Sequence, residues 1–123
     1  NYCEDLIFAQ RLQAAGKMAV VPEALVYWRQ AENLFQFFKQ IFHYAQGDAR
    51  ARYRPHLVKI ATVFARYLVF LIFPPLFLLY LFWPVIKLGR YVSTPGWKYL
   101  PWLQLTADIG VMAGVVSAII SPE

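Results

Sequence analysis

The sequence predicts a mainly helical, membrane-associated protein: a helix with two short strands, then an amphipathic helix, then one to two transmembrane or re-entrant helices. Three observations lead to this fold class. The 123-residue chain is 59% hydrophobic and 18% aromatic, which is too apolar for a soluble domain of this size. Residues 67–86 carry no charge. Directly before this apolar part, residues 33–45 repeat apolar side chains at helical spacing.

The charge of the chain indicates what it binds, and its cysteine content excludes an internal disulfide. Twelve Lys and Arg against seven Asp and Glu give a net charge of +5, and most of the basic residues flank the apolar runs. This placement favours attraction to lipid headgroups over nucleic-acid binding, which requires a basic face without long apolar runs beside it. Cys3 is the single cysteine, so no disulfide forms within the chain. The chain begins at Asn1 without a signal-peptide pattern, and we expect it to be a piece of a longer protein.

The first region, residues 1–32, is polar and mixed in pattern. Helical spacing of apolar residues predicts a helix over residues 4–15, with Gly16 directly after its end. Glu4 and Asp5 then fall in the first turn, where the helix dipole favours negative charge. Two short strands are expected at residues 18–21 and 25–28, with a turn at residues 22–24 between them.

The second region, residues 33–56, is predicted to be an amphipathic helix followed by a basic linker. Asn33 and Gln36 have the spacing of a capping box, and Gly47 with Asp48 offers a stop. We expect the helix to lie at a membrane surface, with its basic residues facing anionic headgroups or phosphates: Lys39, Arg50, Arg52 and Arg54. The alternative is a solvated basic turn beside a core helix.

The third region, residues 57–123, is predicted to be the membrane region. Residues 67–86 are long enough for a span of roughly 30 Å. Pro74 and Pro75 near its middle favour a kinked span or a pair of half-helices over a straight helix. The second run, residues 103–120, carries Gly110 and Gly114 at small-xxx-small spacing. Its only charge, Asp108, is expected to face protein, water or a basic partner, because an exposed charge in a bilayer is costly.

The basic residues around these runs also predict a topology. The N-terminal side and the C-terminus are expected in the cytoplasm, and residues 87–98 outside if both runs cross. If residues 93 and 121 are both cytoplasmic, the first run is a re-entrant or interfacial hairpin.

The sequence offers few candidates for metal-binding or catalytic residues. His43 and His56 have no acidic residue or cysteine at ligand spacing, so we expect this chain to bind no metal. Glu4 and Asp5 remain. A carboxylate at a helix start can act as a general base on a hydroxyl, although the same pair is also an ordinary helix cap.

A resemblance to a known family bears on this choice. The pattern of Glu4-Asp5, Ala15-Gly16 and Val21-Pro22-Glu23-Ala24 resembles the end of the catalytic domain of family 2 glycosyltransferases, the inverting GT-A enzymes. The block with Asn33-Leu34, Phe37-Phe38, Gln40, Tyr44 and Gly47 is similar to the segment that leads into the membrane helices of their membrane-attached members. The resemblance covers residues 1–56 by motif and residues 57–123 by topology and by the ending around Asp108 and Gly110.

The resemblance implies roles for individual residues. Asp5, or less directly Glu4, is the base that deprotonates the acceptor hydroxyl. Gln40, His43 and Tyr44 match the spacing of a Gln-x-x-Arg-Trp motif near the sugar and diphosphate. His43 stands for Arg and Tyr44 for Trp, which favours single transfer over polymer synthesis.

The resemblance also implies partners and a location. The donor is a nucleotide-sugar, the acceptor a lipid-linked or saccharide molecule, and membrane lipids are further partners. A divalent metal, Mg²⁺ or Mn²⁺, is expected in the longer enzyme through residues absent here, so this piece alone is expected to be inactive. The expected location is a membrane, the bacterial inner membrane, with the catalytic side in the cytoplasm. The alternatives are a non-enzymatic membrane scaffold and a transporter or flippase fragment that uses Asp108.

Overall fold

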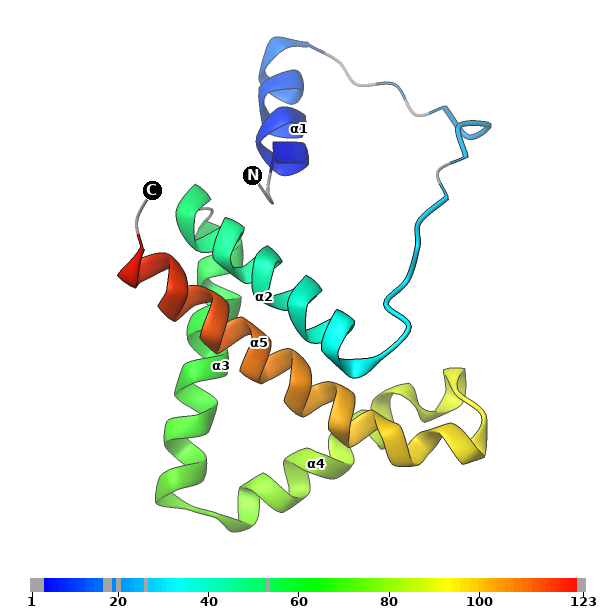
Figure 1. Cartoon of the computed structure of the whole chain (residues 1–123), viewed down its shortest axis with the longest axis vertical. Helices are drawn as coiled ribbons and strands as arrows, with labels where there is room; N and C mark the ends of the chain where they lie inside the picture. The colour runs from blue at the N-terminus through cyan, green and yellow to red at the C-terminus, as the bar shows by residue number, and fades with distance from the viewer. Residues whose placement is uncertain (1–3, 17–18, 20, 26, 53, 122–123) are drawn as a thin grey trace.

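The protein is mainly helical, as predicted (Figure 1). The computed structural model describes residues 4–16, 19, 21–25, 27–52 and 54–121. Its elements are α1 (Glu4–Ala15), α2 (Leu34–Ala51), α3 (Arg54–Ile72), α4 (Pro75–Leu88), the 3₁₀ helices η1 (Gly89–Tyr91) and η2 (Thr94–Tyr99), and α5 (Leu100–Ile120). None of the residues described in these ranges is in a strand.

The first region agrees with the predicted helix but not with the predicted strands. α1 has the predicted bounds, and the Gly16 N–H donates to the Leu12 carbonyl at 3.1 Å just past its end. The expected turn is present, since the Ala24 N–H donates to the Val21 carbonyl at 3.1 Å. Residues 19, 21, 25, 27 and 28, by contrast, have no regular structure. A strand needs a neighbour to pair with its backbone groups, and none of the described residues supplies one.

α2 begins as predicted and ends later. The Asn33 side chain accepts a hydrogen bond from the Gln36 N–H at 2.9 Å, which confirms the N-cap. The Gln36 side chain accepts from the N–H of Glu32, one residue before the cap. Gly47 does not stop the helix, which continues to Ala51. A glycine inside a helix costs about 1 kcal/mol, and packing of the last turns against α5 outweighs that cost.

The predicted span over residues 67–86 is two helices. α3 begins at Arg54 and ends at Ile72, and α4 begins at Pro75. The prolines explain the break, because they remove backbone donors and their rings clash with the preceding turn. Two helices are long and apolar enough to cross a membrane, by length and composition: Arg54–Ile72 and Thr94–Ile120. The second contains the predicted run 103–120.

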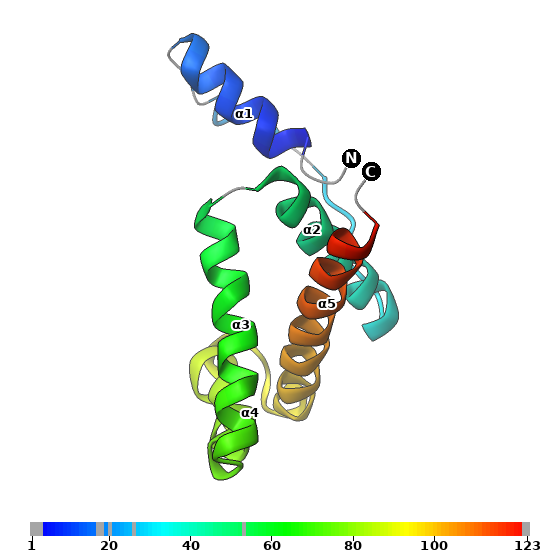
Figure 2. The same ribbon diagram turned by 90° about the vertical axis from the view of Figure 1, so that its left-hand side faces the viewer.

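α5 is the centre of the fold (Figures 1 and 2). α2 packs on it more extensively than any other element, and α3, α4 and η2 also contact it. Among the described residues, the buried Ala, Leu and Val side chains lie on α2 and α5: Ala45, Leu100, Val115 and Ala118. Pro84 on α4 is also buried. α1 stands apart from the other helices in both views.

The two glycines of α5 allow α2 to approach closely. A Cβ on Gly114 would collide with the Phe42 carbonyl oxygen, and a Cβ on Gly110 would lie 3.1 Å from the Ile41 side chain. The small-xxx-small spacing therefore marks a helix contact.

Candidate functional site

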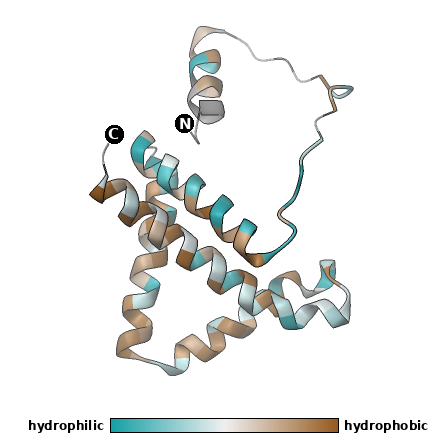
Figure 3. Cartoon of the chain, in the orientation of Figure 1, coloured by the Kyte–Doolittle hydropathy of each residue, from teal (hydrophilic) through white to brown (hydrophobic). Residues whose placement is uncertain are grey.

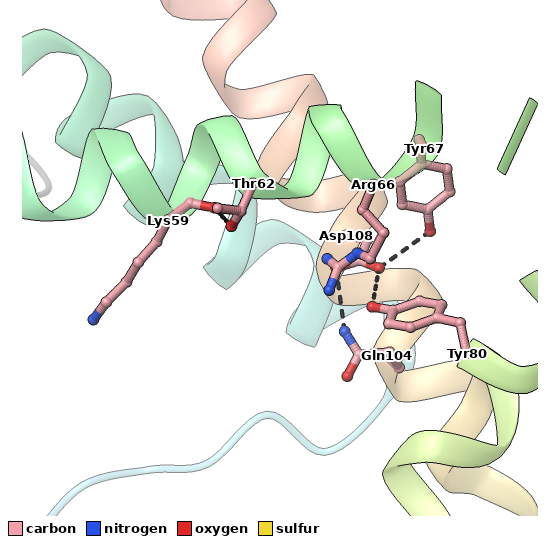
Figure 4. Close-up of polar contacts among 7 residues, drawn as sticks. All are labelled: Lys59, Thr62, Arg66, Tyr67, Tyr80, Gln104 and Asp108. Carbon is pink, nitrogen blue, oxygen red and sulfur yellow. Dashed lines mark hydrogen bonds and ion pairs between the residues drawn. The ribbon is translucent and has the colours of Figure 1, made fainter. Parts of the chain in front are cut away.

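A buried carboxylate ties three helices together. Asp108, on α5, is only 3% exposed. Its Oδ1 accepts from Arg66 Nη2 on α3 at 3.1 Å and from Gln104 Nε2 one turn earlier on α5 at 3.2 Å. Its Oδ2 accepts from the hydroxyls of Tyr67 on α3 at 3.1 Å and Tyr80 on α4 at 2.5 Å (Figure 4). We call these five residues the Asp108 cluster.

The geometry of the cluster satisfies a buried charge. Each carboxylate oxygen has two donors, and Arg66 supplies the compensating positive charge. The Arg66 guanidinium carbon also lies 4.4 Å from the centre of the Tyr80 ring, a cation–π contact. The expectation that Asp108 faces protein and a basic partner is confirmed.

Sequence reasoning found one member of this cluster and missed four. Gln104 could have been found, because residues four apart share a helix face. Arg66, Tyr67 and Tyr80 come from two other helices, and only the way the chain folds back after Ile72 brings them to Asp108.

The residues expected near the sugar and diphosphate lie on one side of α2. Gln40, His43 and Tyr44 are spaced three and four apart, and Gln40 Nε2 donates to the Tyr44 hydroxyl at 3.4 Å. His43 is half-buried, with its ring edge-on to Phe42 at 5.3 Å between centroids. A described contact joins Gln40 to Tyr44, while the role of all three residues toward a substrate stays a prediction.

The basic residues of the second region are spread along α2 and the start of α3. Lys39 Nζ lies 4.8 Å from the Phe35 ring centre near the start of α2, whereas Arg50 donates to the Ser121 carbonyl at the end of α5 at 3.1 Å. Arg52 is the C-cap of α2, with a φ of 51°, and Arg54 begins α3. Arg52 and Arg54 are exposed at the junction of the two helices.

The candidate general base lies outside the described side chains. The backbone of Glu4 and Asp5 forms the first turn of α1, but their side chains are not among the described ones. In the part of the chain that the structure describes, no three His, Cys, Asp or Glu side chains are grouped so that they could hold a metal ion.

Comparisons with known proteins add no relative. No family model, no curated protein and no solved structure matches the chain.

Proposed function

We propose that this chain is the acceptor-side, membrane-anchoring part of a family 2 glycosyltransferase. In this proposal residues 1–32 are the end of a GT-A α/β catalytic domain, residues 33–56 form the interfacial helix and linker, and residues 57–123 form the membrane region. The order of motifs in the sequence carries the proposal. It is supported by the helix that starts at Glu4, by the Asn33 cap at the start of α2, and by the two apolar helices that follow.

The proposed chemistry is a single displacement with inversion. Asp5 accepts the proton of the acceptor hydroxyl while the hydroxyl oxygen forms a bond to the anomeric carbon of the sugar. The bond from that carbon to the nucleoside diphosphate breaks on the opposite face. The start of α1 suits this role, because a helix N-terminus favours the ionised carboxylate that a general base requires. Gln40, His43 and Tyr44 are proposed to contact the sugar and diphosphate.

The test is a pair of substitutions in the intact protein. Asp5→Asn is expected to lower kcat by at least ~100-fold while donor binding changes by less than about 2-fold, because the base acts on the acceptor. Glu4→Gln is the matched control, with the same loss of charge one residue away, and is expected to have a smaller effect. Turnover by Asp5→Asn close to the unmodified protein would overturn the assignment.

The Asp108 cluster favours a second candidate, a membrane scaffold without enzymatic activity. Its hydrogen bonds join α3, α4 and α5, which is what a structural brace requires. The same geometry argues against a transporter fragment that uses Asp108, because an incoming ion or proton must displace a donor already bound to the carboxylate. A scaffold predicts that the intact protein binds no nucleotide-sugar, which equilibrium dialysis with a labelled donor measures directly.

A further inference from the structure

The bend between α3 and α4 is apolar on all sides. From Tyr67 to Ile86 the chain carries no charge, and the large side chains around the bend are exposed: Leu71 by 79%, Ile72 by 84%, Phe73 by 54% and Leu79 by 67%. Figure 3 shows the V formed by these two helices as mostly hydrophobic, with a few paler bands between the brown segments. A bend between two spans that faces water on the far side of a membrane normally carries polar residues, and this one has none.

The backbone N–H groups of the bend need no hydrogen bonds from water. The N–H groups of Phe73, Leu76 and Phe77 donate to Val69, Phe73 and Pro74 carbonyls at 2.8, 3.2 and 2.9 Å. Pro74 and Pro75 have no N–H. Every backbone donor through the bend is therefore either bonded or absent. The bend therefore avoids the cost of several kcal/mol that an unpaired N–H group carries in hydrocarbon.

α4 has no face suited to a membrane surface. An interfacial helix requires a charged or strongly polar side. Between Pro75 and Ile86, the polar groups are the Tyr80 hydroxyl, which is bound to Asp108, and the indole of Trp83. Leu78, Leu79 and Phe82 are all exposed. The composition of α4 therefore suits hydrocarbon better than a membrane surface.

The Asp108 cluster joins the two arms of the V at positions equally many residues away from the bend. Tyr67 lies six residues before Phe73, and Tyr80 lies six residues after Pro74, and both hydroxyls bind Asp108 Oδ2. The two arms are thus held together on the same side of the bend, next to Arg66.

We propose that residues 67–86 form a re-entrant hairpin in one leaflet of the membrane. The bend points toward the bilayer midplane, and Arg66 and Lys87 emerge at the same surface. α3 as a whole is long enough to cross a membrane, so the proposal depends on Arg66 lying at the surface. From there, the arm from Arg66 to Ile72 is about 9 Å long and the arm from Pro75 to Ile86 about 16 Å, and neither crosses a hydrocarbon core of ~30 Å. The partner of this apolar surface is the acyl-chain region of the leaflet. The inference does not depend on the proposed transferase activity.

The first test counts labels on one molecule. The full chain with Cys3→Ser carries two new cysteines, Arg52→Cys before α3 and Ser93→Cys after α4, and is reconstituted into vesicles of phosphatidylcholine and phosphatidylglycerol. A membrane-impermeant maleimide is added outside, and intact mass is measured. The hairpin places both cysteines on one side, so molecules carry two labels or none, whatever the mixture of orientations. A majority with one label would overturn the hairpin, because α3 then crosses the membrane.

The second test measures what surrounds the bend. A bimane dye on Leu71→Cys is expected to be quenched several-fold more by a lipid with a nitroxide deep in its acyl chain than a dye on Leu12→Cys. The Leu12 position is matched as an exposed leucine on a helix outside the hairpin. Quenching at Leu71 no stronger than at Leu12 would show that water or another protein covers the bend, and would overturn the proposal. Far-UV circular dichroism of each variant confirms that the helices remain folded.

Discussion

The contact between α2 and α5 makes Gly114→Ala a sharp test of the fold. At this position an added methyl group meets the Phe42 carbonyl oxygen, and it also comes within 3.1 Å of Ala45 Cβ and of the Gln46 backbone nitrogen. Backbone atoms of a helix cannot turn aside as a side chain does. The two helices must therefore separate.

The expected change in the free energy of unfolding of Gly114→Ala is the balance of a favourable and two unfavourable contributions. Replacing glycine by alanine inside a helix stabilises by about 1 kcal/mol. Overpacking costs about 1–3 kcal/mol. Separation of the helices also weakens the hydrogen bond from Gln46 Nε2 to Ser117 Oγ, 3.0 Å long, which contributes roughly 0.5–1.5 kcal/mol. We expect a net loss of about 1–3 kcal/mol in the free energy of unfolding.

Gly110→Ala is the matched control on the same face of α5. Its methyl group meets the Ile41 side chain at 3.1 Å and the Phe38 carbonyl at 3.4 Å. Because a side chain can shift, the helix gain and the packing cost nearly cancel, and we expect a change within ~1 kcal/mol. Denaturant unfolding in detergent micelles, followed by circular dichroism, measures both variants. Gly114→Ala as stable as the unmodified chain would refute the close approach of α2 to α5.

Two further predictions concern the cluster and the surface of α2. Asp108→Asn leaves the Arg66 charge without its partner, and we expect a loss of about 3 kcal/mol in unfolding free energy, at the low end for a buried pair because Arg66 is one-third exposed. Gln104→Leu removes one of four donors and is expected to cost only about 1 kcal/mol; equal losses in both variants would contradict the cluster. Phe42→Ala on the packed side of α2 is expected to lower stability by about 2 kcal/mol, whereas Phe35→Ala, 65% exposed, is expected to leave it unchanged, as thermal unfolding can check.

Local patterns in the sequence identified the starts of α1 and α2 and the break at Pro74. The cap at Asn33 and the helix from Glu4 to Ala15 depend on hydrogen bonds between residues three or four apart, which any reader of the chain can anticipate. The break at Pro74 has the same local origin, because proline blocks a helix wherever it falls. Residues 18, 20 and 26 of the two expected strands lie outside the described residues, and the described ones have no regular structure, because a strand needs a paired neighbour that local sequence does not guarantee.

The end of α2 shows where local reasoning fails. Gly47 predicts the end of the helix, because glycine has a low intrinsic helix propensity. The helix nevertheless continues to Ala51, because Gln46 and Arg50 find partners at Ser117 and Ser121. Those contacts join residues far apart in the chain and have no local signature.

By itself, then, the sequence determined that this protein is helical and apolar, where α1 and α2 begin, and that Asp108 must be compensated. The tertiary structure alone decided which residues compensate it. Arg66, Tyr67 and Tyr80 meet Asp108 because the chain reverses at Pro74, and because α5 lies close enough for hydrogen bonds from both arms. The physical reason is the range of the interactions. Caps and breaks act within one turn of a helix, whereas a buried charge is satisfied by whichever donors the packed helices bring to it.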